Sequence, residues 1–505
     1  MRKTSWVGRS CKRHDELARD SYNEQGQLLS SRGAIPLRAS AGPRHRPKIV
    51  QKHEPSSRHG GQPMPAFNTM QPYPTVHLGT LSTSESVPLL QADRRRHVAL
   101  FGQTGTGKTG LLLNLMQADL LGGGGFCFLD PHGDAAQDIA ALTPESRSND
   151  VLYFDPSDPG YSFAFNPLSG ILPEARATAA ANIVSAFKNI WAESWGPRLE
   201  FILSNSLRLL LDTKDQTLLG LPFLLTNDTY RQFLAKRCQD PVVRSYWMNE
   251  YPSFDQRQRN DMISPIQNKI GILLANPFIR SILCQPSSTL DIQTIMDKGQ
   301  VLIINLAKGN LGTDPAHLMG AILITAFAQA AEARRKLPED QRRDFTLYCD
   351  EFQNFATDSF AGIMSEARKF RLSLVIANQH VSQLPDTLRE AVFGNVGTMI
   401  AFRVGALDAP LLARELSLGN PRTLQDNANF SAWVKLMSDG TPIGPLHLKT
   451  PPPIKPGTRL ASVIARTQGR HMLNRSLVNT QIENFLRVHA PQLIKKSKKR
   501  RHPDR

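Results

Sequence analysis

Short apolar runs alternate along the middle of the chain with longer stretches of helical periodicity. Runs of this length with little polar alternation are typical of strands that are buried on both faces of a parallel sheet. We expect two lead-in strands at Val76–Gly79 and Val87–Leu90, followed by strands at Arg96–Phe101, Phe126–Asp130, Val151–Asp155, Val301–Leu306, Phe345–Cys349, Leu372–Ala377 and Thr398–Phe402. This alternation predicts an α/β fold in which a mostly parallel sheet is flanked by helices.

Residues 173–290 interrupt the alternation. Helical periodicity dominates there, as in Phe201–Leu211, and runs of β-branched residues are few. We therefore expect an inserted all-α domain at 173–290. It divides the α/β domain into a first part at 76–172 and a second part at 291–450.

The most apolar helical stretch is Leu318–Ala331. It is shorter than the roughly 20 residues that cross a bilayer, it contains Gln329, and it runs directly into Glu332. Met1–Asp20 is charged throughout and lacks the apolar core of a signal peptide. The five cysteines are scattered, which fits a reducing compartment and no zinc site. We expect a buried helix, no direct membrane span, and a cytoplasmic protein that reaches the inner face of the membrane through partners.

The net charge of +16 is concentrated at the two ends. Residues 1–60 hold 13 Lys and Arg against 5 Asp and Glu, and residues 491–505 hold 7 against 1, which leaves +2 for the residues between. The composition predicts a disordered basic N-terminal segment at 1–75, and for 451–505 a Pro-rich linker, a short helix near Ser476–Val488 and a disordered basic tail. The ends could contact DNA or an acidic membrane surface, or could only keep the chain soluble.

A phosphate-binding loop follows the expected strand at Arg96–Phe101. The string GQTGTGKT fits the pattern G-x-x-x-x-G-K-[ST] and opens an expected helix, which is the context that this motif requires. The loop predicts a site for ATP, in which backbone N–H groups and the helix N-terminus meet the phosphates. Its residues are Gly102, Gln103, Thr104, Gly105, Thr106, Gly107, Lys108 and Thr109. Lys108 would bridge the β- and γ-phosphates, and the Thr109 hydroxyl would ligate Mg²⁺.

An acidic pair, Asp350 and Glu351, ends the strand expected at Phe345–Cys349 and lies 242 residues after Lys108. Carboxylates at a strand end face the phosphate crevice of such a sheet. Asp350 would hold Mg²⁺, through water, and Glu351 would orient and polarise the attacking water. The alternative is an acidic pair that only caps a helix. A glutamate here favours an ATPase over a kinase, because a kinase has no water to activate.

Three further residues could complete the site. Gln379 ends the strand at Leu372–Ala377, where it could contact the γ-phosphate, although an ordinary strand-end amide is the alternative. Arg368 precedes that strand and could act as an arginine finger in a neighbouring subunit's site. Arg403 is a competing candidate for the finger, and a solvated basic helix end is the alternative for Arg368. For a pore contact, Lys308 is the residue that the sequence offers.

At these residues the chain resembles the FtsK/HerA superfamily of P-loop ATPases, and within it the type IV secretion coupling proteins of the TraG/TraD kind. The resemblance covers about residues 76–450. Beside the two motifs above, it rests on Arg96–His97, Leu129–Asp134, Phe165–Leu168, Trp195–Glu200 and Ala377–His380. It implies a RecA-like P-loop NTPase fold with an inserted helical domain. It also implies a homohexameric ring with ATP at the subunit interfaces and DNA in the pore.

The resemblance favours an ATP-dependent DNA translocase of the conjugative type IV secretion kind, with a relaxase or other secretion-system proteins as possible partners. Two alternatives remain. One is an ATP-switched recruitment platform for protein cargo, and the other is a cytosolic HerA-like ATPase that processes or packages DNA. Coupling proteins of this kind usually carry N-terminal transmembrane helices, whereas this chain has a basic segment there, which puts direct membrane docking in doubt.

Overall fold

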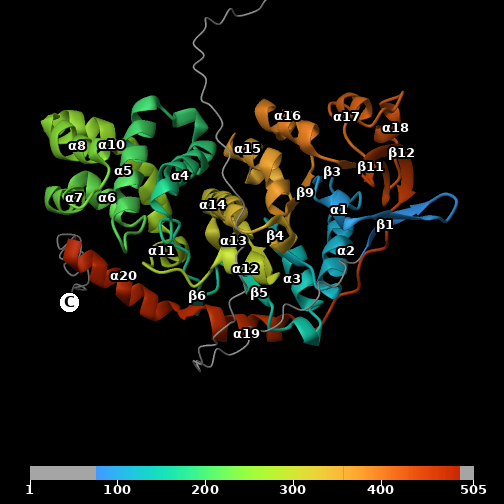
Figure 1. Ribbon diagram of the computed structural model, residues 1–505, viewed down its shortest axis with the longest axis horizontal. Helices are drawn as coiled ribbons and strands as arrows, with labels where there is room; N and C mark the ends of the chain where they lie inside the picture. Colours follow the sequence, from blue (N-terminus) through green and yellow to red (C-terminus); the bar gives the residue numbers. More distant parts are fainter. Residues whose placement is uncertain (1–74, 356–357, 490–505) are drawn as a thin grey trace, which may run out of the picture. The chain divides into compact units, whose positions relative to one another are not determined.

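A computed structural model describes residues 75–355 and 358–489, all of which belong to one compact unit, Gln71–Arg505 (Figure 1). The basic segment expected at 1–75 and the basic tail at the end of the chain lie outside the described residues, apart from residue 75 itself.

An 11-stranded sheet forms the centre of the unit, in the order β2-β1-β12-β11-β10-β3-β9-β8-β4-β7-β5. The strands from β10 to β5 run parallel to one another. Their bounds are β10 (Thr398–Ala401), β3 (Val98–Phe101), β9 (Leu372–Asn378), β8 (Phe345–Cys349), β4 (Gly125–Asp130), β7 (Val301–Asn305) and β5 (Val151–Phe154). The expectation of a mostly parallel sheet in an α/β fold is confirmed.

The other strands extend this sheet in antiparallel pairing. They are β1 (Val76–Leu81), β2 (Ser86–Leu89), β11 (Ser431–Ser438) and β12 (Thr441–Lys449). The sequence did not predict the β11–β12 hairpin. Its first strand alternates buried and half-buried positions, so it has no continuous apolar run.

Helices cover both faces of the parallel strands, and alternate side chains of one strand enter different cores. Leu100 of β3 packs in the core that includes α2 and α3, whereas its neighbour Phe101 packs in the core that includes α14. The covering and connecting helices are α1 (Gln91–Arg94), α2 (Lys108–Leu121), α3 (Asp134–Ala141), α12 (Ile292–Lys298), α13 (Lys308–Leu311), α14 (Thr313–Ala333), α15 (Asp358–Glu366), α16 (Asp386–Asn395), α17 (Ala409–Glu415) and α18 (Arg422–Gln425).

Helix α14 contains the apolar stretch that the sequence analysis expected to be buried. Among the described residues, the helical stretch Thr313–Lys336 alone is long and apolar enough to cross a membrane, and two thirds of its apolar window is buried within the fold. Leu318, Leu323 and Phe327 are completely buried. The burial of these side chains fits a core helix of the α/β fold.

A helical region lies between the short strand β6 (Tyr161–Ser162) and β7, on the left in Figure 1. Its helices are α4 (Arg176–Ile190), α5 (Pro197–Asp212), α6 (Gly220–Thr226), α7 (Asp228–Ala235), α8 (Pro241–Ser245), α9 (Tyr251–Ser253), α10 (Gln256–Ala275) and α11 (Pro277–Leu283). One hydrophobic core runs from the sheet through α14 and α4 into this region. The boundaries of a separate all-α domain at 173–290 stay a prediction.

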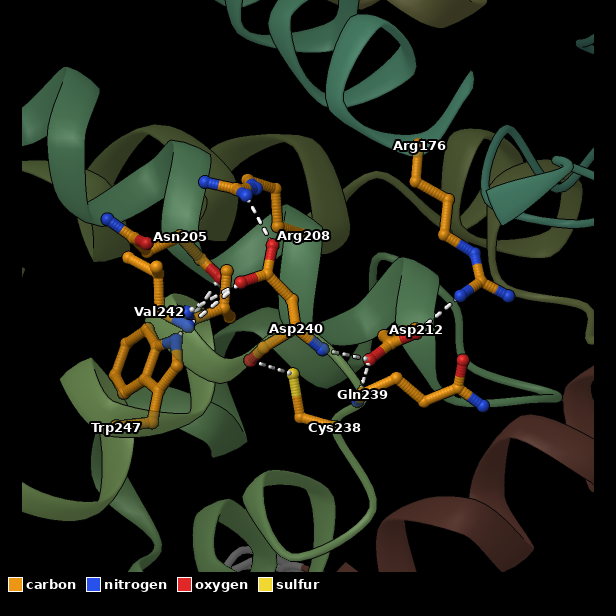
Figure 2. Close-up of polar contacts among 10 residues, drawn as sticks. Arg176, Asn205, Arg208, Asp212, Cys238, Gln239, Asp240, Val242 and Trp247 are labelled. Carbon is orange, nitrogen blue, oxygen red and sulfur yellow. Dashed lines mark hydrogen bonds and ion pairs between the residues drawn. The ribbon is translucent and has the colours of Figure 1, made fainter. Parts of the chain in front are cut away.

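Two aspartates tie the helices of this region together (Figure 2). Asp240 is the N-cap of α8: its Oδ1 accepts from the backbone N–H groups of Val242 (2.9 Å) and Val243 (3.2 Å), and its other oxygen pairs with Arg208 of α5. Asp212, at the end of α5, pairs with Arg176 of α4 and accepts from the backbone of the segment that leads to α8. Such charge-assisted bonds hold α4, α5 and α8 in place relative to one another.

The chain ends in a feature that we call the C-terminal strap, residues 460–489. It consists of α19 (Leu460–His471), the short strand β13 (Leu473–Asn474) and α20 (Arg475–His489). Helix α19 packs on β5 and α3 of the sheet, whereas α20 packs on α11 of the helical region. The sequence did not predict α19, because its single apolar stripe is narrow and its other positions are polar.

Candidate nucleotide-binding site

The phosphate-binding loop connects β3 to α2. Gly105 and Gly107 have φ angles of 77° and 117°, in the region that favours glycine, which lets the loop close tightly in front of the helix N-terminus. The ammonium of Lys108 donates to the carbonyl oxygens of Gly102 (2.5 Å) and Gln103 (3.0 Å). Burial lowers the pKa of Lys108, and the nearby carboxylates of the acidic pair oppose that shift. The lysine is therefore held beside the loop and close to those acids.

The acidic pair follows β8, which is separated from β3 by β9 alone. The Thr109 hydroxyl donates to Asp350 Oδ2 over 2.9 Å, so the first residues of α2 and the end of β8 meet. Burial raises the pKa of Asp350, and the Thr109 hydrogen bond opposes that shift. A hydroxyl and a carboxylate oxygen at this separation fit Mg²⁺, which takes few protein ligands and completes its shell with water and phosphate oxygens. The described residues hold no cluster of three or more His, Cys, Asp or Glu that could bind a metal ion.

Glu351 is held by three donors. Its Oε1 accepts from Gln379 Nε2 over 2.5 Å and lies 2.9 Å from His132 Nε2, and its Oε2 accepts from Asn354 Nδ2 over 3.1 Å. Its backbone is left-handed, with φ 45° and ψ 52°, a conformation that is rare outside glycine and concentrates at functional sites. Burial opposes ionisation, but the hydrogen bond and charge of His132 outweigh it and lower the pKa of Glu351. The side chain is therefore an oriented carboxylate.

His132 lies within Leu129–Asp134, and the sequence predicted no role for it. The residue follows β4, the strand that pairs with β8, so its loop reaches the same sheet edge as Glu351. Asp130 fixes this loop by accepting from the backbone N–H groups of His132 (2.9 Å) and Ala136 (2.8 Å). Although burial lowers the pKa of His132, the contact with Glu351 raises it overall. The signal in the sequence was a polar residue shortly after an expected strand, whereas the pairing of that strand with β8 is a finding of the structure.

The remaining candidates lie at different edges of the sheet. Gln379 follows β9 and Arg403 follows β10, and the Arg403 carbonyl accepts from the Gln103 N–H over 2.8 Å. Arg368 precedes β9, so it lies at the opposite edge, where it lines a cavity of about 260 Å³ together with Arg95 and Arg96. Within one chain the structure brings Gln379 and Arg403 to the phosphate loop, but not Arg368.

Lys308 begins α13, directly beyond the end of β7. It contributes to lowering the pKa of Glu351, so its charge lies near the acidic pair. Its suggested role as a pore contact stays a prediction.

This combination of a phosphate loop, a buried acidic pair and a central parallel sheet defines the RecA-like class of P-loop ATPases. Comparisons with known protein families and structures support this class. Residues 76–316 match the family described as "Helicase HerA, central domain" (DUF87). Over these residues the chain is similar to the HerA central domain, and its other likenesses are to type IV coupling proteins and to VirB4.

One curated relative is the type 4 coupling protein DotL of Legionella pneumophila. It is 20% identical over an alignment of 372 residues, and the match covers 61% of this chain and 47% of DotL, so the chain spans about half the length of that relative. Among solved structures, the fold is similar to the bacterial conjugative coupling protein TrwBdeltaN70, with a TM-score of 0.54, 16% identity and coverage of 76% and 90% of the two chains. It is also similar to VirB4 of Thermoanaerobacter pseudethanolicus, with a TM-score of 0.52, 12% identity and coverage of 76% and 98%. A further similar structure is TrwB "in complex with ADP and Mg2+".

Proposed function

We propose that this chain binds ATP with Mg²⁺ and hydrolyses it. The observation that carries the proposal is the contact of Thr109 with Asp350, next to a Glu351 carboxylate that is held by three donors. The complex of TrwB with ADP and Mg²⁺ supports the choice of ligands.

Each residue then has a separate task. Lys108 would leave the loop carbonyls and neutralise charge on the β- and γ-phosphates, while Thr109 and Asp350 would hold Mg²⁺, Asp350 through water. When bound, the metal withdraws charge from the phosphate oxygens. Glu351 would orient the attacking water and accept its proton, and Gln379, now bonded to Glu351, would exchange this contact for the γ-phosphate.

The central test replaces the base. Glu351→Gln keeps the shape of the side chain but removes the proton acceptor, so we expect nucleotide affinity to be retained and turnover to fall by about 10²-fold or more. Lys108→Ala is the matched control, because it should lose binding as well as turnover. Normal turnover by Glu351→Gln would refute the assignment of the base.

We further propose that hydrolysis drives a homohexameric ring that moves DNA in a type IV secretion system, at the inner face of the membrane and together with partners such as a relaxase. The match to the HerA central domain and the likeness to the coupling protein DotL support this proposal. It predicts that DNA stimulates the ATPase and that rings form with ATP and DNA. An ATPase rate that is the same without DNA and with single- or double-stranded DNA would contradict it.

The position of Arg368 supports a finger role in trans, because its own phosphate loop lies at the other edge of the sheet. Mixing Arg368→Ala with Lys108→Ala protein tests this. Interfaces that combine an intact loop with an intact Arg368 should regain activity. A mixture that is as inactive as its components would argue against Arg368 and leave Arg403 as the candidate.

One observation favours the alternative of a recruitment platform for protein cargo. Several large apolar side chains of the helical region are exposed, among them Phe201, Phe233, Val242, Met248 and Ile272. Exposed apolar surface is typical of protein-binding sites. Co-purification of a relaxase or secreted protein by a chain whose ATPase ignores DNA would favour this function over DNA movement.

A further inference from the structure

Phe430 is an aromatic residue in a conformation that packing does not explain. It lies directly before β11 and has a φ of 60°, which is a genuine outlier for a bulky side chain. Its side chain belongs to neither of the two hydrophobic cores, and the residue is 41% exposed. Strained backbone of this kind is found at ligand clamps and active sites.

The backbone of Phe430 is fixed to the phosphate-binding loop. Its N–H donates to the carbonyl oxygen of Thr106 over 2.8 Å, and its own carbonyl accepts from the backbone N–H (2.9 Å) and the hydroxyl (3.0 Å) of Thr450. The ring lies close to Gly107: a Cβ built there would be 3.0 Å from its Cδ1 atom. Phe430 is therefore held in one place between the loop and the end of β12.

A nucleotide has a charged phosphate end and a flat, largely apolar base. The residues of the candidate site described above would contact the phosphate end. The loop, Lys108 and the acidic pair all address phosphates and the metal. A nucleobase needs a flat apolar partner, and stacking on an aromatic side chain stabilises a bound base by about 1–3 kcal/mol. Phe430 offers such a surface within contact distance of the loop, and it is fixed before any ligand arrives.

We propose that the ring of Phe430 stacks on the base of the nucleotide whose phosphates bind at Gly102–Thr109. The inference rests on the proposed nucleotide binding and adds the base subsite to it. Stacking involves the flat face of a base and not its hydrogen-bonding edge. Phe430 therefore contributes affinity for adenine and guanine alike. The strained φ is the cost of presenting the ring at this position.

The test compares ligands with and without a base. Titration calorimetry with ADP and with inorganic pyrophosphate is carried out on the wild type, Phe430→Ala, Phe430→Trp and Phe430→Gly. We expect ADP to bind about 5- to 150-fold more weakly to Phe430→Ala and Phe430→Gly, as the loss of one stacked base predicts, and to Phe430→Trp about as tightly as to the wild type. Pyrophosphate affinity should stay the same in all of them. Ile443→Ala, another exposed apolar residue of the same hairpin, is the control and should bind both ligands normally.

Phe430→Gly also separates binding from folding. Glycine adopts a φ of 60° without strain, so this variant should melt at the wild-type temperature or above it while it loses ADP affinity. Unchanged ADP affinity in Phe430→Ala and Phe430→Gly would overturn the proposal, and so would equal losses for ADP and pyrophosphate, since these would mean that Phe430 only shapes the loop. If the wild type bound neither ligand, the proposed nucleotide binding itself would fail.

Discussion

Stability should depend on pH through one buried histidine, His97, which begins the segment that leads into β3. Its Nδ1 accepts from the Leu374 N–H of β9 over 3.1 Å, so its Nε2 carries the proton and donates to the Met364 carbonyl of α15 over 2.9 Å. A second proton would have to sit on Nδ1 and face the Leu374 N–H. Burial, reinforced by the charge of Arg368 and opposed by the Met364 hydrogen bond, lowers the pKa of His97 from 6.5 to about 4.

The sign and size of the effect follow from this shift. Because the unfolded chain binds the proton more readily than the folded one, the stability that His97 contributes is complete above pH 6.5 and is lost as the pH falls toward 4. One pKa unit corresponds to about 1.4 kcal/mol. The loss should therefore be about 2 kcal/mol at pH 5 and about 3 kcal/mol once the pH is below 4.

The variant His97→Gln isolates this contribution, because glutamine is polar and does not titrate. Urea unfolding of both proteins at pH 8 and pH 5 gives the free energy of unfolding of each. Carboxylates titrate in both proteins, so their effect cancels in the comparison. The difference in the free energy of unfolding between wild type and variant should shrink by about 2 kcal/mol from pH 8 to pH 5. A difference that stays constant over this range would refute the buried neutral state of His97.

Three further predictions concern other contacts. Arg94 and Asp119 form a fully buried ion pair (2.7 Å). Asp119→Asn should therefore lower the free energy of unfolding by about 3–5 kcal/mol. A melting temperature within a degree of that of the wild type would contradict this prediction. His132→Ala should lower kcat with little change in nucleotide affinity, because Glu351 loses the donor that His132 provides. His132→Gln keeps a donor and should recover much of the lost kcat. An equal loss of kcat in both variants would mean that the hydrogen bond to Glu351 does not explain the effect. Asp240→Ala removes the α8 N-cap and should cost about 1–2 kcal/mol of stability, measured by urea unfolding against the exposed control Gln137→Ala.

The sequence predicted the parts of the fold that are encoded locally. The strands at Phe345–Cys349 and Val301–Asn305 are mostly apolar because every position in them is buried, and the phosphate loop is a contiguous string. The strand β11 and the helix α19 were missed for the opposite reason. Each is half-exposed, so its pattern resembles that of a polar connection, and only the packing of β11 on β10 and of α19 on β5 orders it.

Like the fold, the candidate site was predictable where its residues belong to local sequence motifs. Lys108, Thr109 and the acidic pair belong to short motifs, and the placement of the pair at a strand end predicted its meeting with the loop. The contacts of His132 with Glu351 and of Phe430 with the loop join residues more than 200 positions apart. No local pattern encodes such contacts, because they arise from strand order and from the path of the chain between strands.

The C-terminal strap has a mechanical consequence. At one end, Thr467 of α19 accepts from the backbone N–H of Tyr153 in β5 (3.1 Å), and at the other end Phe485 of α20 lies against Phe223 and Tyr230 of the helical region. Between them the buried Arg475 donates to the carbonyl oxygens of Asp158 and Tyr161. A chain segment that is anchored on both the sheet and the helical region resists movement of one relative to the other. If hydrolysis at the sheet edge drives movement, the strap adds stiffness, so that displacement at the sheet is passed on to the helical region.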